Sequence, residues 1–547
     1  MRRRILMLTA ATMAWGLLAA PAAADDDPSA TEPTGDSSEP AGLFPGAPWF
    51  RPAAPYEQNF PDPHVLFHDG TYYAYATNTG GPQLPAMTST DLERWTAAPA
   101  WSPNPYNDDP FYADRLVRSP DWAASVGGQA EVWAPAVVPL AGTWRAYYAI
   151  RETNAARPRY CISVAPGPGP LGPFRDSSAA PITCGLGPAG AIDPWVYVDR
   201  SGTPWLLWKT GPFDAIGVLP DTPAAIWSQP LAPNGLAFRE GSRAQILLTA
   251  DPGGWEAGVI ENPALFEMGG RLHLYYSGNR FDTPFYATGW ATCSSPAGPC
   301  SRAQPGPILV SGPGFNGPGG ASVFTDANGD HRIAYHAWNA PYAAYPSYPA
   351  CDTDRDGVCA DQGQRFLHIG LVCELAGGTP HIGFPLGWRF CDVDPASWYG
   401  GAVNWLADAG VTRGATEFRF VPAQLLTRAE LVTMLWRWAG SPPPGDGPRF
   451  TDVPAGTFFA DAVGWAARVG VVNGATATTF SPHARVSRSE VAAIVHRAAG
   501  TPPAAGSADY ADVPPDAFFA AGVAWLTEAG VVNGYSPTTF GPAEPVD

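Results

Sequence analysis

Two kinds of hydrophobic pattern divide the chain near residue 390. Up to about residue 340, short apolar runs alternate with turns centred on glycine, and each turn leads into a run rich in Tyr and Trp, a pattern typical of β-hairpins. Five such hairpins recur at a spacing of roughly 60 to 70 residues, and their turn glycines are Gly70, Gly142, Gly202, Gly270 and Gly329. A β-sandwich is the competing interpretation, but its strands would not repeat at so long a period. We therefore predict an all-β five-bladed β-propeller with long connecting loops.

Beyond residue 390, a helical pattern repeats every 60 residues. An Asp-Val pair opens each copy and a Trp falls in step with it, at Asp392, Asp452, Asp512, Trp405, Trp465 and Trp525. In the second copy, one face of a predicted helix that should end at Asn473-Gly474 collects Phe459, Ala462, Val463, Ala466 and Val469. Thr427-Arg-Ala-Glu430 and Ser487-Arg-Ser-Glu490 each predict a capping box at the start of a further helix.

These patterns set the expected domain boundaries. The propeller should span residues 49–388, and small α-helical modules should follow at 389–440, 449–500 and 509–547, separated by Pro-rich links. The third module stops before its second capping box, so we expect it to be truncated.

The first residues predict export. Three arginines, an apolar run from Ile5 to Leu18 and a row of alanines ending at Ala24 have the layout of a signal peptide over residues 1–24. The apolar run is short for a membrane span, and no second one follows, so no span is expected in the mature chain. Residues 25–48 are acidic and Pro-rich, which predicts a disordered linker.

Charge and cysteines narrow the class of protein. The formal net charge is -18, and Lys209 is the only lysine, so no basic stripe is available for nucleic acid or an anionic bilayer. Eight cysteines suit structural disulfides in an oxidising exterior, and the absence of CxxC pairs argues against zinc. The cysteines closest in sequence are Cys293 with Cys300 and Cys351 with Cys359, although the connectivity is left open.

Three blades offer a carboxylate at one equivalent place. Eight or nine residues before the turn glycines, the five blades carry Asp62, Trp133, Asp193, Glu261 and Gly320. The prolines that follow each acid predict an extended backbone there. This strand lies nearest the axis of a propeller, so the three acids should meet in one pocket. Their repulsion would raise at least one pKa and leave an acid beside a base, as hydrolysis of a glycosidic bond requires. Turn capping or cation binding is the alternative.

These residues resemble glycoside hydrolase family 43, over nearly all of residues 58 to 340. The motifs that carry the resemblance are Phe60-Pro-Asp62-Pro-His-Val65, Ser89-Thr-Asp-Leu-Glu-Arg-Trp95, Val132-Trp-Ala-Pro-Ala-Val137, Ile192-Asp-Pro194, Ile260-Glu-Asn-Pro263 and Tyr335-His336. Related fructan-cleaving propellers carry Arg and Cys where this chain has Ile192 and Asn262.

The resemblance implies a role for each acid. Asp62 would be the general base that activates water, Glu261 the general acid, and Asp193 the group that orients Glu261 and tunes its pKa. It also implies inversion at the anomeric carbon, for which the two carboxyls need a gap of about 6.5 to 9.5 Å. Trp133 is a candidate for stacking on a sugar ring, and blade packing is the equal alternative.

A metal site is implied less directly. By the same resemblance, His336 would hold a metal ion, Ca²⁺ at the propeller axis, or an ordered water, whereas a core histidine is the alternative. The family's second histidine is missing from Gly319-Gly320-Ala321-Ser322. Between two cysteines, Asp352, Asp354 and Asp356 resemble the opening of a calcium loop, but the closing Glu is missing, which favours a solvated acidic turn. No organic cofactor is expected.

The C-terminal copies resemble S-layer homology modules, which commonly bind cell-wall polysaccharide. Arg428 and Arg488 would contact its acidic groups or, equally, remain solvated in their capping boxes. We therefore expect a secreted, cell-wall-associated bacterial enzyme that hydrolyses arabinose- or xylose-containing polysaccharides. The alternatives are an inactive carbohydrate-binding propeller and a structural surface-layer protein.

Overall fold

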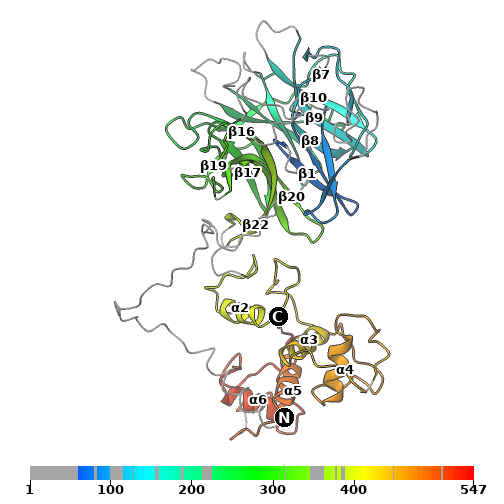
Figure 1. Ribbon diagram of the computed structural model, residues 1–547. Coiled ribbons are helices and arrows are strands. Elements are labelled where there is room, and N and C mark those ends of the chain that lie inside the picture. Colours follow the sequence, from blue (N-terminus) through cyan, green and yellow to red (C-terminus); the bar gives the residue numbers. More distant parts are fainter. Residues whose placement is uncertain are drawn as a thin grey trace, which may run out of the picture. The chain divides into compact units, whose positions relative to one another are not determined.

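The computed structural model describes residues 59–78, 83–98, 115–126, 129–153, 159–185, 190–211, 224–312, 314–339, 341–344, 363–375, 378–383, 389–446, 449–506 and 509–546 (Figure 1). The predicted signal peptide, the linker, the acidic turn at Asp352 and the pair Cys351 and Cys359 lie outside these ranges. The chain forms two compact units, and the boundary between them falls after Cys391.

The first unit is a five-bladed β-propeller, as predicted. Each blade is an antiparallel sheet whose strands follow one another in chain order. Blade 1 contains β1 (His64–His68), β2 (Thr71–Tyr75), β3 (Ala86–Ser89) and β4 (Trp95–Ala97). Blade 2 contains β8 (Val132–Leu140), β9 (Thr143–Arg151) and β10 (Tyr160–Gly167). Blade 3 contains β12 (Ile192–Val198), β13 (Pro204–Thr210), β14 (Ala225–Pro230) and β15 (Gln245–Thr249).

The last two blades complete the ring. Blade 4 contains β16 (Ile260–Met268), β17 (Arg271–Gly278), β18 (Ala287–Cys293) and β19 (Cys300–Arg302), and blade 5 contains β20 (Phe315–Thr325), β21 (His331–Asn339), β22 (Arg365–Glu374) and β23 (Pro380–Ile382). The first strands of successive blades contact one another in the order β1, β8, β12, β16, β20 and back to β1. These strands therefore surround the axis. Outside the blades, β5 (Leu116–Arg118) pairs with β11 (Phe174–Arg175), and β6 (Ser125–Val126) pairs with β7 (Gln129–Ala130).

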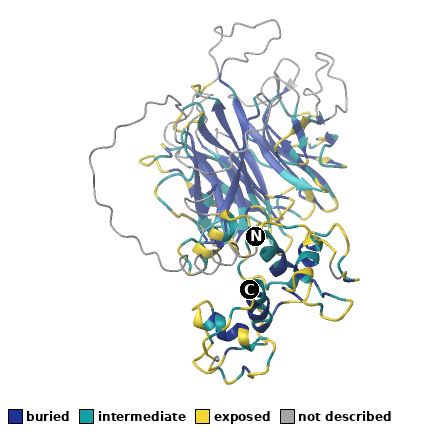
Figure 2. Cartoon of the chain, turned by 60° about the horizontal axis from the view of Figure 1, so that its bottom comes forward, coloured by how far each residue is buried: buried dark blue, intermediate teal, exposed yellow. Residues whose placement is uncertain are grey.

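Apolar side chains hold the blades face to face. Figure 2 shows the strands as mostly buried, with exposed residues concentrated in the turns. The indole of Trp195 in blade 3 donates to the carbonyl of Leu265 in blade 4 at 3.0 Å, so this ring is both packed and satisfied. Blades 1 and 5 are joined without a shared strand, because the amide of Phe60 donates to the carbonyl of Arg365 at 2.7 Å.

All six described cysteines form disulfides. The pairs are Cys161–Cys184, Cys293–Cys300 and Cys373–Cys391. Cys293 and Cys300 lie opposite each other in neighbouring strands of blade 4, as their closeness in sequence indicated. These pairings leave no thiolate among the described residues to bind zinc.

The second unit is helical. Its helices are α2 (Gly400–Asp408), α3 (Arg428–Trp438), α4 (Ala460–Arg468), α5 (Arg488–Ala498) and α6 (Ala520–Glu528). The two predicted capping boxes are present, with Thr427 and Ser487 as N-cap residues. None of these helices has the length and apolar character needed to cross a bilayer.

The predicted end of the second copy's first helix is wrong. Helix α4 ends at Arg468, several residues before Asn473, and Val469 is 46 % exposed rather than part of the buried face. Gly470 has φ of 78°, and the amide of Val471 donates to the carbonyl of Ala466 at 2.9 Å. This is a Schellman turn, in which a left-handed glycine satisfies the last carbonyls and stops the helix.

The Asp-Val pairs have a structural reason. The carboxylate of Asp452 accepts hydrogen bonds from the backbone amides of Phe480 at 2.8 Å and Ser481 at 2.7 Å. These bonds connect the first residues of the repeat to its later part. Asp392 and Asp512 make the equivalent bonds in the other two copies. These hydrogen bonds lower the pKa of Asp452 and of Asp512.

Candidate active site

Five residues with left-handed backbone surround the propeller axis, one from each blade. They are Asp62, Ala134, Asp193, Asn262 and Gly320, with φ of 51°, 42°, 57°, 48° and 62°. The first strand of blades 2 to 5 has a register shift at this point, which indicates a β-bulge. All five residues line one axial cavity, whose volume of about 20 Å³ suits a single water molecule.

This ring corrects two expectations. The extended backbone predicted at Asp62 and Asp193 is wrong, because both residues lie in the left-handed region despite the prolines that follow them. At Asp193 this conformation coincides with the register shift of β12. The alignment of the blades is also shifted by one residue. Ala134 and Asn262 are the structural equivalents of Asp62, whereas Trp133 and Glu261 each come one position earlier. The alignment by sequence accepted positions either eight or nine residues before the turn glycine, so it did not reveal this shift of one residue.

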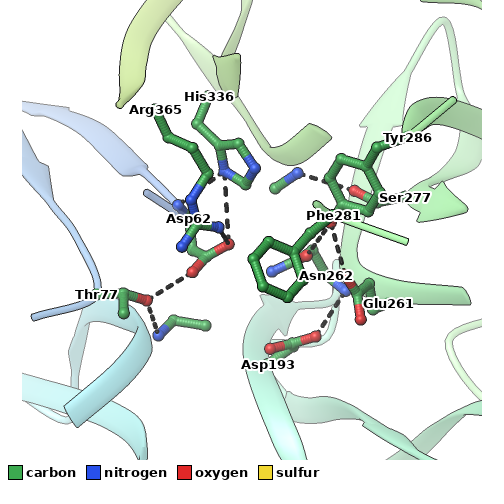
Figure 3. A network of polar contacts seen from close by, with 12 residues as sticks. Asp62, Thr77, Asp193, Glu261, Asn262, Ser277, Phe281, Tyr286, His336 and Arg365 are labelled. Atoms are coloured by element: carbon green, nitrogen blue, oxygen red, sulfur yellow. Dashed lines mark hydrogen bonds and ion pairs between the residues drawn. The ribbon is translucent and has the colours of Figure 1, made fainter. Parts of the chain in front are cut away.

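The three acids nevertheless come together. Figure 3 shows Asp62, Asp193 and Glu261 in one network of polar contacts, although blades 1, 3 and 4 supply them. Burial is the main cause of the raised pKa of both Asp62 and Asp193, and charge repulsion from Glu261 adds to it. The convergence predicted from the repeats is therefore present.

Asp62 is held from three sides. Thr77 donates its hydroxyl proton to the Asp62 carboxylate at 2.6 Å, and the guanidinium of Arg365 lies 3.6 Å from the other carboxylate oxygen. Burial is the main cause of a raised pKa at Asp62, which Arg365, Thr77 and the Asn262 side chain partly offset. Donors and a cation thus favour the ionised form, the form that a general base needs.

Asp193 is the most buried of the three acids. Its side chain accepts the backbone amide of Asn262 at 3.0 Å, and the residue is 6 % exposed. Burial, followed by repulsion from Glu261, raises the pKa of Asp193 to about 8, although the ammonium of Lys209 opposes the shift. These surroundings favour the protonated form of Asp193.

Both oxygens of Glu261 accept hydrogen bonds. The ammonium of Lys209 donates to Oε2 at 2.7 Å, and the hydroxyl of Tyr286 lies 2.8 Å from Oε1. The Glu261 side chain is 13 % exposed, and that of Lys209 is 2 % exposed.

Tyr286 and Asn262 connect the candidate acid to the candidate base. The Tyr286 hydroxyl lies 2.9 Å from Oδ1 of Asn262 as well as next to Glu261, and the Asn262 side chain hydrogen-bonds Asp62. The hydroxyl has one proton for two acceptors, so it donates to Glu261 or to Asn262 at any moment. A chain of hydrogen bonds thus runs from Glu261 through Tyr286 and the Asn262 side chain to Asp62.

Side chains from preceding blades fix this ring. Four of the five left-handed amides donate to a side chain of the blade before their own, in the pairs Asp62 to His336, Ala134 to Thr77, Asn262 to Asp193 and Gly320 to Ser277. The distances lie between 2.8 and 3.0 Å. Because the bonds cross from blade to blade, the arrangement of the acids depends on closure of the whole propeller.

His336 does not fit the role of a metal ligand. Its Nδ1 accepts the amide proton of Asp62 at 2.9 Å, and burial lowers the pKa of the ring well below its usual value. The neutral ring therefore carries its proton on Nε2, a buried atom without a hydrogen-bond partner among the described residues. An N–H group offers no lone pair to Ca²⁺. Within the described ranges, no three His, Cys, Asp or Glu side chains at the axis bring their ligand atoms within 4.8 Å of one another either.

Trp133 lies beside the network and is partly buried. Its ring stacks on Tyr160, with centroids 4.0 Å apart and an interplanar angle of 20°. It also packs against the cluster formed by Ala149, Tyr160 and Ile192. One face of the indole is thus used for blade packing.

In the helical unit, the two arginines reach from one repeat to the next. Arg428 pairs with Glu490 at 2.8 Å and donates to the carbonyls of Phe480 and Asn473, with an 11 % exposed side chain. Arg488 makes the equivalent carbonyl bonds to Phe540 and Asn533. Neither is a freely solvated residue of its capping box.

Sequence reasoning missed five residues of the site: Thr77, Lys209, Asn262, Tyr286 and Arg365. Two of them carried a signal, since Lys209 is the only lysine of an acidic chain and Asn262 adjoins Glu261. The other three act on partners that are distant in sequence, such as Arg365 on Asp62, and no local pattern marks them.

Comparisons with known proteins agree with this division of the chain. A family model described as glycosyl hydrolases family 43 matches residues 54–358, and the S-layer homology domain matches residues 389–432, 449–492 and 509–547. The crystal structure of a thermostable family-43 glycoside hydrolase aligns with a TM-score of 0.47 and 21 % identity, over 60 % of this chain and 94 % of that one.

Two curated relatives match different parts. The probable arabinan endo-1,5-alpha-L-arabinosidase B of Aspergillus fumigatus is 24 % identical over 353 residues, which cover 56 % of this chain and 84 % of the relative. The surface-layer 125 kDa protein of Lysinibacillus sphaericus is 35 % identical over 94 residues, 17 % of this chain. The match spans only 8 % of that protein's length.

Proposed function

Because the chain belongs to the glycosyl hydrolases family 43, we propose that its propeller cleaves arabinose- or xylose-containing polysaccharides with inversion at the anomeric carbon. Family membership makes the propeller a glycoside hydrolase unit. The sugar, the linkage and the stereochemistry are the proposal. The observation that supports it is the meeting of Asp62, Asp193 and Glu261 in one network of polar contacts, in which burial raises the pKa of Asp193.

Each acid has a role that its surroundings suit. Asp62, whose ionised form is favoured by Thr77 and Arg365, takes a proton from the water that attacks the anomeric carbon. Glu261 gives a proton to the leaving oxygen as the glycosidic bond breaks, so that one proton enters and one leaves the site. Asp193 sits between them through its bond to the Asn262 amide and serves as the group that positions and tunes Glu261.

The substrate class rests on similarity. The Aspergillus fumigatus relative is named as an arabinan-cleaving enzyme, and its likeness extends over 84 % of its length. Trp133, with one face packed on Tyr160, would offer its other face to a sugar ring.

The S-layer homology domains suggest a bacterial cell-surface association. We extend this to an exported enzyme held on cell-wall polysaccharide. Arg488 supports the extension, because its guanidinium makes no ion pair among the described residues and is available to an acidic group. A chain ending near Gly387 should then stop co-sedimenting with purified cell walls, and unchanged sedimentation would remove the anchoring role.

The enzymatic proposal is tested with a panel of arabinofuranosyl and xylosyl substrates, with the configuration of the first-formed sugar followed by NMR. Asp62→Asn and Glu261→Gln should each reduce kcat/KM on unactivated substrates by about 10²- to 10⁴-fold, the range for loss of general acid or base catalysis. Circular dichroism checks that each variant is folded. Full activity in either variant, or retention of configuration, would overturn the assignment.

A further inference from the structure

The chain's only lysine lies inside the site. Lys209 is in β13 of blade 3, and its ammonium donates to Glu261 of blade 4 at 2.7 Å. A lysine side chain that is 2 % exposed is costly to bury unless a charge compensates it. Its position is therefore a specific feature of this site rather than a surface charge.

The two cations of the site form ion pairs with only two of its three acids. Among the ion pairs of the described residues, Asp62 faces Arg365 and Glu261 faces Lys209, whereas Asp193 makes none. Asp193 receives only the neutral amide of Asn262. Lys209 also acts on Asp193 and opposes its raised pKa, but a buried carboxyl without an ion pair of its own is the one that most readily keeps a proton when three compete.

Other side chains around Glu261 complete the description of its surroundings. Tyr286, from the segment before β18, offers its hydroxyl to the free oxygen of Glu261, and Asp62 approaches from blade 1. Arg365 and the neutral ring of His336, both from blade 5, lie on the far side next to Asp62. Both oxygens of Glu261 therefore face donors, the Lys209 ammonium and the Tyr286 hydroxyl.

We propose that Lys209 is a positioning residue for Glu261, whose ammonium keeps this carboxylate ionised in the free enzyme so that the proton of the pair resides on Asp193. The inference rests on the proposed function, in which Glu261 is the general acid. For catalysis, the proton must then move from Asp193 to Glu261, one carboxyl losing what the other gains, before it reaches the leaving oxygen. Lys209 thereby sets the pH at which the pair loses its shared proton.

The experiment is a pH profile of kcat/KM for Lys209→Met and Lys209→Arg on a pentose disaccharide that the wild-type enzyme hydrolyses. The alkaline limb reports loss of the shared proton in the free enzyme. Removing the cation should move that limb to higher pH by about one unit or more, the size of effect for a charge at this distance. Lys209→Arg keeps the charge and should leave the limb close to its wild-type position.

A matched control comes from the same two blades. Arg200 in blade 3 pairs with Glu267 in blade 4 away from the axis, and its side chain is 75 % exposed. Arg200→Met removes an arginine–glutamate pair without touching the site, so neither limb of the profile should move. An equal shift in this control would mean that the effect is one of net charge and would overturn the proposal.

The possible outcomes distinguish failure of the role of Lys209 from failure of the proposed hydrolase function. If the wild-type chain hydrolyses no pentose glycoside, the proposed function fails before Lys209 is considered. If it is active and folded Lys209→Met keeps the wild-type alkaline limb, the positioning role is refuted while the function stands. If Lys209→Met does not fold, the alkaline limb of Asp193→Asn is measured instead. In this variant Glu261 is the remaining carboxyl beside Lys209, so it should lose its proton at a lower pH than the wild-type pair does. A limb that stays or rises in Asp193→Asn refutes the proposal.

Discussion

The imidazole of His336 accepts the backbone amide of Asp62 at 2.9 Å, across the junction between the last blade and the first. This bond uses the nitrogen lone pair of a neutral ring and leaves the other nitrogen protonated. His336 therefore acts as a brace for the candidate base, at the place where the propeller closes.

A first prediction follows for metal dependence. Because His336 offers no lone pair to a cation in this arrangement, dialysis against a chelator should leave both kcat/KM and Tm unchanged. Loss of activity that added Ca²⁺ restores would contradict this and would require the bond between His336 and Asp62 to rearrange.

A second prediction concerns Thr77, whose hydroxyl donates to the Asp62 carboxylate at 2.6 Å while it accepts the amide of Ala134 at 2.8 Å. Thr77→Val removes a bond that lowers the pKa of Asp62. The acid limb of the kcat/KM profile should therefore move to higher pH, because the base must lose its proton to act. Thr77→Ser retains the hydroxyl and serves as the control. An unmoved acid limb in folded Thr77→Val would argue against Asp62 as the base.

A third prediction concerns stability. The pKa of Asp193 is raised from 3.8 to about 8 on folding, so between these values the folded state binds more protons than the unfolded chain. The stabilisation is fully present below pH 3.8 and is lost as the pH rises towards 8. Asp193→Asn should remove part of this slope, which is about 1.4 kcal/mol per pH unit at most.

Denaturant unfolding of the propeller at pH 5 and pH 8 measures this slope. Asp199→Asn is the matched control, because Asp199 lies in a turn of the same blade and its pKa is lowered rather than raised. The control should change stability equally at the two pH values. A wild-type slope identical to that of Asp193→Asn would mean that Asp193 is ionised when folded.

A fourth prediction concerns the helical unit. Arg428 joins the first repeat to the second through Glu490 and the carbonyls of Phe480 and Asn473. Arg428→Ala leaves the partly buried acceptors Glu490 and Phe480 without this donor and should lower the stability of this unit by about 1 to 3 kcal/mol. Calorimetry would detect this as a lower Tm of the unit's transition.

Arg468→Ala is a suitable comparison, since Arg468 also donates to backbone carbonyls but does so at exposed positions. Its effect on Tm should be small. If the two variants behave alike, the contacts of Arg428 do not hold the repeats together.

The sequence by itself determined the elements and their repetition. Turn glycines such as Gly70 and capping boxes such as Thr427 to Glu430 are local signals, because a left-handed turn or a helix start needs particular residues within a few positions. The repetition of the hairpins then predicted five blades. Because Asp62, Asp193 and Glu261 occupy similar positions in their blades, the sequence also predicted that they meet near one axis. One local signal was misread, because the left-handed Gly470 ends its helix before Asn473.

Only the tertiary structure decided how the acids are bound and protonated. The bulge that coincides with the left-handed backbone of Asp193 is a property of paired strands. The partners Arg365 and His336 reach Asp62 from about 300 and 270 residues away in the chain. Burial raises the pKa of Asp193, although Lys209, which pairs with Glu261, opposes this shift. Such effects depend on distances and desolvation in three dimensions, which residue types and spacings in one dimension do not specify.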